Sequence, residues 1–143
     1  MIEGAELKKK FQVAFVMAIA LCWALMLLIG AVAFLIARHG PLGGAGLDRS
    51  LMEIVGSVIC LLTHFLSMYV KRRLLASKER TIEHLHRVMF MSFAICEAGI
   101  LLSVILAFIN YDIRGLIPPM VFGALGFSTH FPKYDQWQQW LRS

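Results

Sequence analysis

One acidic residue, Glu97, interrupts the apolar stretch SFAICEAGILL, which covers residues 92–102. A charged side chain at the centre of a membrane helix costs about 2.5–3.5 kcal/mol on insertion scales, so it must be protonated or paired. Such groups usually face a bundle interior, where they serve as relays, ion sites or structural pairs. Glu97 is therefore the first candidate for chemistry in this chain.

His64 and Thr63 are the polar residues expected to meet Glu97. Counted at about 1.5 Å per residue from the flanking basic residues, they lie within about one helical turn of its depth. The sequence therefore predicts a polar pair of Glu97 with His64, with Thr63 beside it. Three roles stay open for this pair: an interhelical hydrogen bond, a proton or cation relay, and an interface with another subunit.

The three cysteines raise the alternative of a metal site. Cys22, Cys60 and Cys96 fall at similar depths, and Cys60 and His64 share a helix face at i,i+4. Thiolate and imidazole ligands suit zinc or copper. Paired-Cys and HxxxH spacings are missing, however, and lone cysteines are ordinary apolar fillers. We therefore expect no metal, and we keep Cys22, Cys60, Cys96 and His64 as the minor alternative.

Neither a cofactor nor enzymatic activity is indicated. The sequence contains no P-loop, GxSxG, HExxH or dinucleotide fingerprint. A haem held by His64 with His84 or His86 is poorly placed, because the last two lie near the cytoplasmic edge. We expect a protein that is not an enzyme and has no cofactor.

Four apolar runs must position these side chains. The chain is 59% hydrophobic and 16% charged, with a mean hydropathy of +0.71. Since about 20 helical residues cross the roughly 30 Å hydrocarbon core, the runs predict one membrane domain. Its fold class is all-α, a bundle of four transmembrane helices at about residues 11–37, 51–73, 84–109 and 116–131. A soluble core would need polar helix faces, and a β-barrel would need alternating residues; the runs have neither.

The basic residues predict the orientation of the helices. Eleven of the fourteen Lys and Arg residues lie in segments 1–10, 71–87 and 132–143. Because cytoplasmic segments carry such an excess, we expect an N-in and C-in protein of a bacterial inner membrane. The net charge of +5 then orients the chain in the lipid bilayer. No nucleic-acid partner is expected.

Two segments outside the runs have their own signals. Residues 74–83 contain no glycine or proline, so they predict a basic hairpin tip, with Thr81 as the N-cap of the third helix. Residues 132–143 predict a tail along the membrane interface, where amphipathic rings settle. The rings around this interface are those of His130, Tyr134, Trp137 and Trp140.

An internal similarity relates the first run to the third. Eight identities match residues 17–34 to residues 91–108 at an offset of 74. Two duplicated helical hairpins would explain them and would make the first and third helices parallel equivalents. The counterpart of Glu97 is then Trp23, so the carboxylate belongs to one half only.

The third run also resembles a known helix. Residues 87–109, RVMFMSFAICEAGILLSVILAFI, are similar to the carboxylate-bearing helix of rotary ATPase proteolipid (c) subunits. That resemblance implies that Glu97 is an ion carrier, although the second run has only Gly56 where that family has a glycine-rich repeat. The whole chain resembles small four-span bacterial membrane proteins of unassigned function with an Ala-x-x-Glu-Ala/Ser motif, here Ala94, Glu97 and Ala98.

The sequence is consistent with two functions. The first is a non-enzymatic accessory or interaction subunit, in a homo-oligomer or a larger membrane complex, with Glu97 organising helix packing. The alternative is a proton or cation translocating component, with Glu97 as the titrating carboxylate and His64 as its neighbour.

Overall fold

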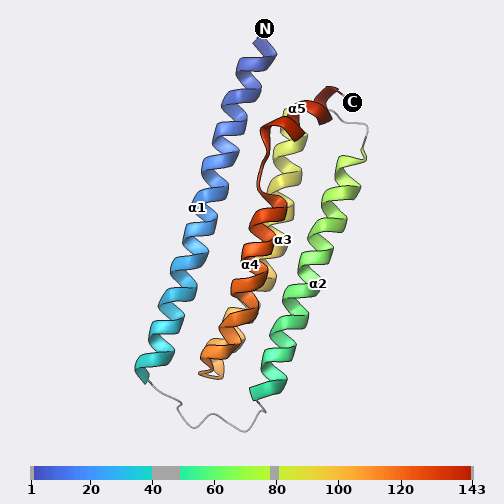
Figure 1. Cartoon of the computed structure of the whole chain (residues 1–143). Coiled ribbons are helices and arrows are strands. Elements are labelled where there is room, and N and C mark those ends of the chain that lie inside the picture. Colours follow the sequence, from blue (N-terminus) through green and yellow to red (C-terminus); the bar gives the residue numbers. More distant parts are fainter. Residues whose placement is uncertain (1, 40–48, 78–80, 143) are drawn as a thin grey trace.

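The computed structural model describes residues 2–39, 49–77 and 81–142, and every regular element within these ranges is helical (Figure 1). The elements are α1 (Ile2–His39), α2 (Arg49–Leu75), α3 (Ile82–Ile109), the 3-10 helix η1 (Ile113–Leu116), α4 (Ile117–His130) and α5 (Tyr134–Arg142). The all-α fold class is confirmed.

Three of the described helices, α1, α2 and α3, are long and apolar enough to cross a membrane. The prediction of a membrane protein is confirmed by the length and composition of these helices. The fourth predicted span is shorter than expected, because α4 has only 14 residues and follows a separate 3-10 turn. The length of α4 alone therefore does not qualify it as a fourth membrane span.

The long helices lie side by side and alternate in direction (Figure 1). Helices α1 and α3 run one way, and α2 and α4 run the other way. The start of α1, the end of α2, the start of α3 and the helix α5 lie at one end of the molecule, which we call the terminal end. The short helix α5 crosses this end, over the ends of the long helices.

Local signals explain where α3 and α4 begin and end. The Thr81 hydroxyl accepts a hydrogen bond from the His84 backbone N–H, which confirms Thr81 as the N-cap of α3. After Asn110, Tyr111 adopts a positive φ of 48°, and Asp112 accepts a hydrogen bond from the Arg114 N–H. This turn reverses the chain. Pro118 and Pro119 then occupy the first turn of α4, where a missing N–H costs nothing.

Helices α2 and α3 form the most closely packed pair. Gly99 of α3 lies against the Thr63 side chain, with no room for a Cβ, and Gly56 of α2 lies against Ser103. Small residues at such crossings let membrane helices approach closely. Helix α4 packs against both of them, so α2, α3 and α4 form a compact body.

Helix α1 packs on this body mainly near its two ends. At the terminal end Leu7, Ala14 and Ala18 join a buried cluster with residues of α3 and α5. At the other end Ile29, Val32 and Ile36 join a second cluster with α3 and η1. The middle of α1 borders two cavities instead, one toward α3 and one toward α4. The centre of α1 therefore leaves space between itself and the neighbouring helices.

The tail folds back onto the terminal end. Trp137 is buried there, and its ring lies 5.5 Å from the Phe11 ring of α1. The Trp140 indole N–H donates to the Leu75 carbonyl of α2 at 3.0 Å, and the ring stacks on His84 of α3. Helix α5 therefore ties three helices together at this end.

Candidate functional site

Glu97 lies in a groove between α3 and α1. The groove has a volume of about 170 Å³ and is lined by Glu97, Leu101, Leu21, Ala24, Leu25 and Leu28. The carboxylate is half-buried, and all the other lining residues are apolar. Within the described residues it makes no hydrogen bond or ion pair. The Glu97 carboxyl group is therefore a hydrogen-bond acceptor in apolar surroundings, and the described part of the chain offers it no donor.

The predicted pair of Glu97 with His64 is not formed in the structure. Glu97 faces α1, whereas the His64 ring lies among Phe65, Phe122 and His130. Residue counts predict depth along the bilayer but not the rotation of a helix about its axis. Among the described side chains, no hydrogen bond or ion pair joins the two residues.

Thr63 acts within α2 and against α3. Its hydroxyl donates to the backbone carbonyls of Ile59 at 2.9 Å and Cys60 at 3.1 Å. Its side chain also lies directly over Gly99. Thr63 therefore contributes to the close crossing of α2 and α3 and makes no described contact with Glu97.

His64 lies close to two residues from other helices. One ring nitrogen of His64, the Cys96 Sγ and one ring nitrogen of His130 lie within 4.8 Å of one another. These residues belong to α2, α3 and α4. Cys96 and His130 are buried, with exposed fractions of 4% and 1%. His130, which the sequence suggested as an interfacial ring, is instead an interior residue.

The four residues of the minor metal alternative are divided by the structure. His64 and Cys96 come together, while the Cys60 thiol donates to the Gly99 carbonyl at 3.7 Å. Cys22 lies on α1 and lines an apolar cavity of about 650 Å³ that α1 shares with η1 and α4. Only half of the set that the sequence suggested therefore lies in one place.

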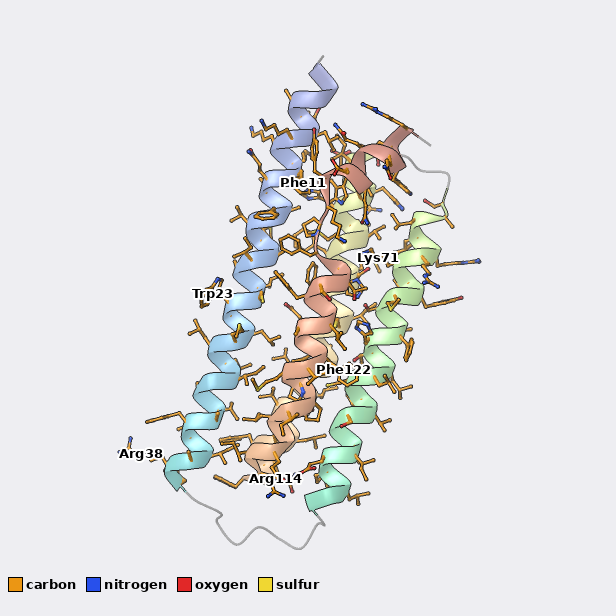
Figure 2. The ribbon with its side chains drawn as sticks, in the orientation of Figure 1. Phe11, Trp23, Arg38, Lys71, Arg114 and Phe122 are labelled. Carbon is orange, nitrogen blue, oxygen red and sulfur yellow. The ribbon has the colours of Figure 1, made fainter. Side chains whose placement is uncertain are left out.

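Trp23 is the residue of interest that sequence reasoning noted only as the counterpart of Glu97. It is 63% exposed near the middle of α1 and points away from the other helices (Figure 2). Within the described residues its indole N–H has no acceptor. Trp usually lies at the bilayer interface, where its N–H can reach a polar partner. The signal in the sequence is a Trp in the middle of an apolar run, far from either predicted membrane interface.

Comparisons with protein-family models, curated proteins and solved structures find no match for this chain. The resemblance of α3 to the proteolipid helix therefore stays a prediction.

Proposed function

We propose that this chain is a non-enzymatic interaction subunit in which Glu97 organises helix packing between copies of the chain. One observation carries the proposal. The Glu97 carboxylate and the Trp23 indole N–H are an acceptor and a donor without partners in the described chain. An unsatisfied polar group in hydrocarbon is costly. A contact between two copies would satisfy both.

The two groups are at matching depths. Trp23 is adjacent in sequence to Ala24, which lines the groove around Glu97 together with Leu21, Leu25 and Leu28. Helices α1 and α3 run in the same direction in the structure (Figure 1). Two copies embedded in the same membrane would therefore hold Trp23 and Glu97 at about the same level.

The contact would be of the head-to-tail type. At about 100° per residue, Trp23 lies on the far side of α1 from Leu21, Leu25 and Leu28. The donor and the groove are thus on different surfaces of one chain. Such a heterologous contact repeats from copy to copy and closes into a ring when the rotation allows it.

The proposed subunit crosses a bacterial inner membrane four times, with both termini in the cytoplasm. Helix α4 has 14 residues and η1 has four. With rises of about 1.5 Å per α-helical residue and about 2.0 Å per 3-10 residue, the two together reach roughly 29 Å, close to the hydrocarbon thickness. The concentration of Lys and Arg in segments 1–10, 71–87 and 132–143 supports a cytoplasmic terminal end.

Three variants test the role of Glu97 in assembly. Glu97→Leu and Trp23→Phe each remove one hydrogen-bonding group, whereas Glu97→Gln keeps a carbonyl acceptor. We expect purified parent and Glu97→Gln to have the mass of an oligomer in lipid nanodiscs, and the first two variants to be monomers with unchanged helical content. Glu53→Gln, on α2, is the matched control. A monomeric parent, or oligomers of undiminished mass in both Glu97→Leu and Trp23→Phe, would refute the proposal.

The same variants distinguish the proposed interaction subunit from the alternative, a proton or cation translocating component. A titrating carboxylate is required if Glu97 carries protons or cations, and Gln cannot replace it. The interaction subunit predicts no proton flux in liposomes for the parent or for Glu97→Gln. Flux in the parent that is lost in Glu97→Gln, with assembly intact, would favour the alternative and contradict our assignment.

A further inference from the structure

We propose that His64, Cys96 and His130 form a binding site for a transition metal of the zinc and copper(I) class. Each of three helices supplies one ligand: α2 supplies His64, α3 supplies Cys96 and α4 supplies His130. Imidazole nitrogen and thiolate sulfur are the ligands that these ions prefer. This site is independent of the groove around Glu97.

The ring nitrogens of both histidines are available as ligands. Within the described residues, the Nδ1 atoms of His64 and His130 are buried and have no hydrogen-bond partner. Buried polar atoms are nearly always satisfied, so two such atoms on histidines that cluster with one thiol indicate a missing partner. A metal ion coordinated through Nδ1 of both histidines would satisfy the two nitrogens at once.

A neighbouring hydroxyl orients one of the ligands. His130 Nε2 is hydrogen-bonded to the Oγ of Ser67, which is fully buried on α2. When Nε2–H donates to Ser67, the Nδ1 atom carries the free lone pair that a metal requires. Such a second contact fixes both the tautomer and the ring orientation of metal-binding histidines.

The packing leaves room for the thiol. A Cβ on Gly126 of α4 would lie 2.5 Å from Cys96 Sγ, so only glycine lets the sulfur rest against the α4 backbone. The three ligand atoms lie within 4.8 Å of one another. With bonds of about 2.0–2.3 Å, ligand atoms around a tetrahedral ion are roughly 3.3–3.8 Å apart, so small side-chain shifts would close the site.

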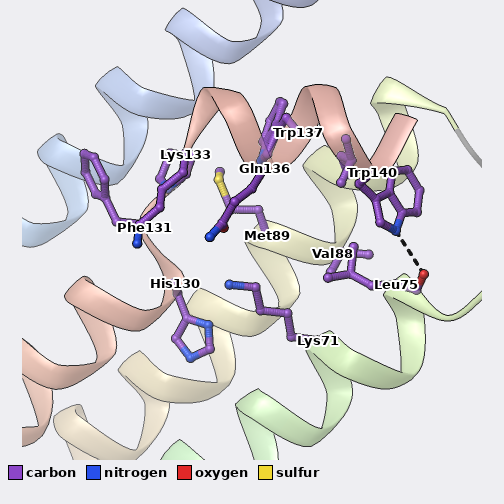
Figure 3. A pocket seen from close by; sticks show the side chains of 12 residues that line it. Lys71, Leu75, Val88, Met89, His130, Phe131, Lys133, Gln136, Trp137 and Trp140 are labelled. Carbon is purple, nitrogen blue, oxygen red and sulfur yellow. Dashed lines mark hydrogen bonds between the residues drawn. The ribbon is translucent and has the colours of Figure 1, made fainter. Parts of the chain in front are cut away.

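A cavity at the terminal end reaches one of the three ligands, His130 (Figure 3). Its volume is about 220 Å³, and its lining includes His130, Lys71, Val88, Met89, Trp137 and Trp140. The Lys71 ammonium donates to the Thr129 carbonyl at 3.0 Å and adds positive charge nearby. That positive charge repels a cation held by neutral ligands alone. It also stabilises a thiolate, so it favours an ion whose binding deprotonates the Cys96 thiol.

Metal titration of the purified protein tests the site. The protein is prepared without a polyhistidine tag, stripped with a chelator and titrated with Zn²⁺, with Cu⁺ under reducing conditions, and with Co²⁺ as a spectroscopic probe. We expect one ion per chain and a thiolate-to-cobalt charge-transfer band. Cys96→Ser and His130→Ala should each weaken binding at least tenfold, while Cys60→Ser, which changes a buried thiol outside the site, should not.

Protection of the thiol provides a second measurement on the unaltered protein. Bound metal should slow alkylation of Cys96 at least tenfold, measured by mass spectrometry, and should leave the rate at Cys22 unchanged. Gly126→Ala should lower the affinity, because its Cβ displaces the sulfur. Absence of binding by all three ions would overturn the proposal. So would binding that Cys96→Ser and His130→Ala leave unchanged, or Cys96 protection that His130→Ala leaves unchanged.

Discussion

Thr63 and Gly99 lie face to face where α2 and α3 cross, and no Cβ fits on residue 99 without displacing the Thr63 side chain. This contact sets how closely the two helices approach. It also fixes the rotation of α3, so that Gly99 faces α2 while Glu97, two residues earlier, faces α1. The position of one small residue therefore decides which helix the carboxylate meets.

Gly99→Ala should destabilise the α2 and α3 crossing. Because the added methyl group overpacks a filled site, we expect a loss of about 1–3 kcal/mol in the free energy of unfolding. The measurement is unfolding in mixed micelles followed by circular dichroism. Gly30→Ala is the control, since a Cβ at Gly30 of α1 would meet nothing within 4 Å. Equal stability of the two variants would contradict the close crossing.

Trp137→Ala should loosen the terminal end. The Trp137 side chain is 6% exposed and packs between α1 and α3 in a cluster with Leu7 and Leu85. Truncating a buried aromatic residue costs about 3–5 kcal/mol. The expected result is a lower unfolding midpoint and faster proteolysis of the tail. The exposed neighbour Gln139→Ala should leave both quantities unchanged, and similar behaviour of the two variants would refute the docking of α5.

Ser67→Ala tests the internal contact between α2 and α4. The substitution leaves the buried Nε2 of His130 without its partner, and an unsatisfied buried group costs about 1–3 kcal/mol. The free energy of unfolding of the metal-free protein should fall by that amount. Ser57→Ala is matched, because the Ser57 hydroxyl donates at 2.8 Å only within its own helix, to the Glu53 carbonyl. An unchanged free energy of unfolding in Ser67→Ala would contradict the contact between Ser67 and His130.

Much of the helical content could be predicted from the sequence, for physical reasons that act locally. Apolar length and composition predict α1, α2 and α3, the hydroxyl of Thr81 predicts the start of α3, and the pair Pro118 and Pro119 predicts the start of α4. Each of these signals depends on neighbouring residues in one segment. None depends on how the helices pack.

The candidate sites depend on packing and were harder to predict. Residue counting gave the depth of Glu97 and His64 but not the direction in which each points, so their predicted pairing is not formed. The position of His130 at a helix end indicates an interfacial ring, yet it is buried against Ser67 of α2 and Phe93 of α3. A uniformly apolar helix has little amphipathic signal to reveal its rotation.

The central claim is a contact between the Trp23 face of one copy and the Glu97 groove of the next. Leu27 lies one turn from Trp23 and is 69% exposed, and Leu101 lines the groove. With the native cysteines replaced, Leu27→Cys and Leu101→Cys chains are made separately, each with its own tag, and are co-reconstituted and treated with a short bis-maleimide. We predict a cross-linked dimer that contains one chain of each kind.

The control partner is a Leu62→Cys chain. Leu62 is 63% exposed on α2, away from the groove. A strong Leu27 to Leu101 cross-link, absent when Leu62→Cys replaces Leu101→Cys and weakened by Glu97→Leu, is the result that the account predicts. No cross-link between the Leu27 and Leu101 positions, or equal cross-linking to Leu62, would contradict it.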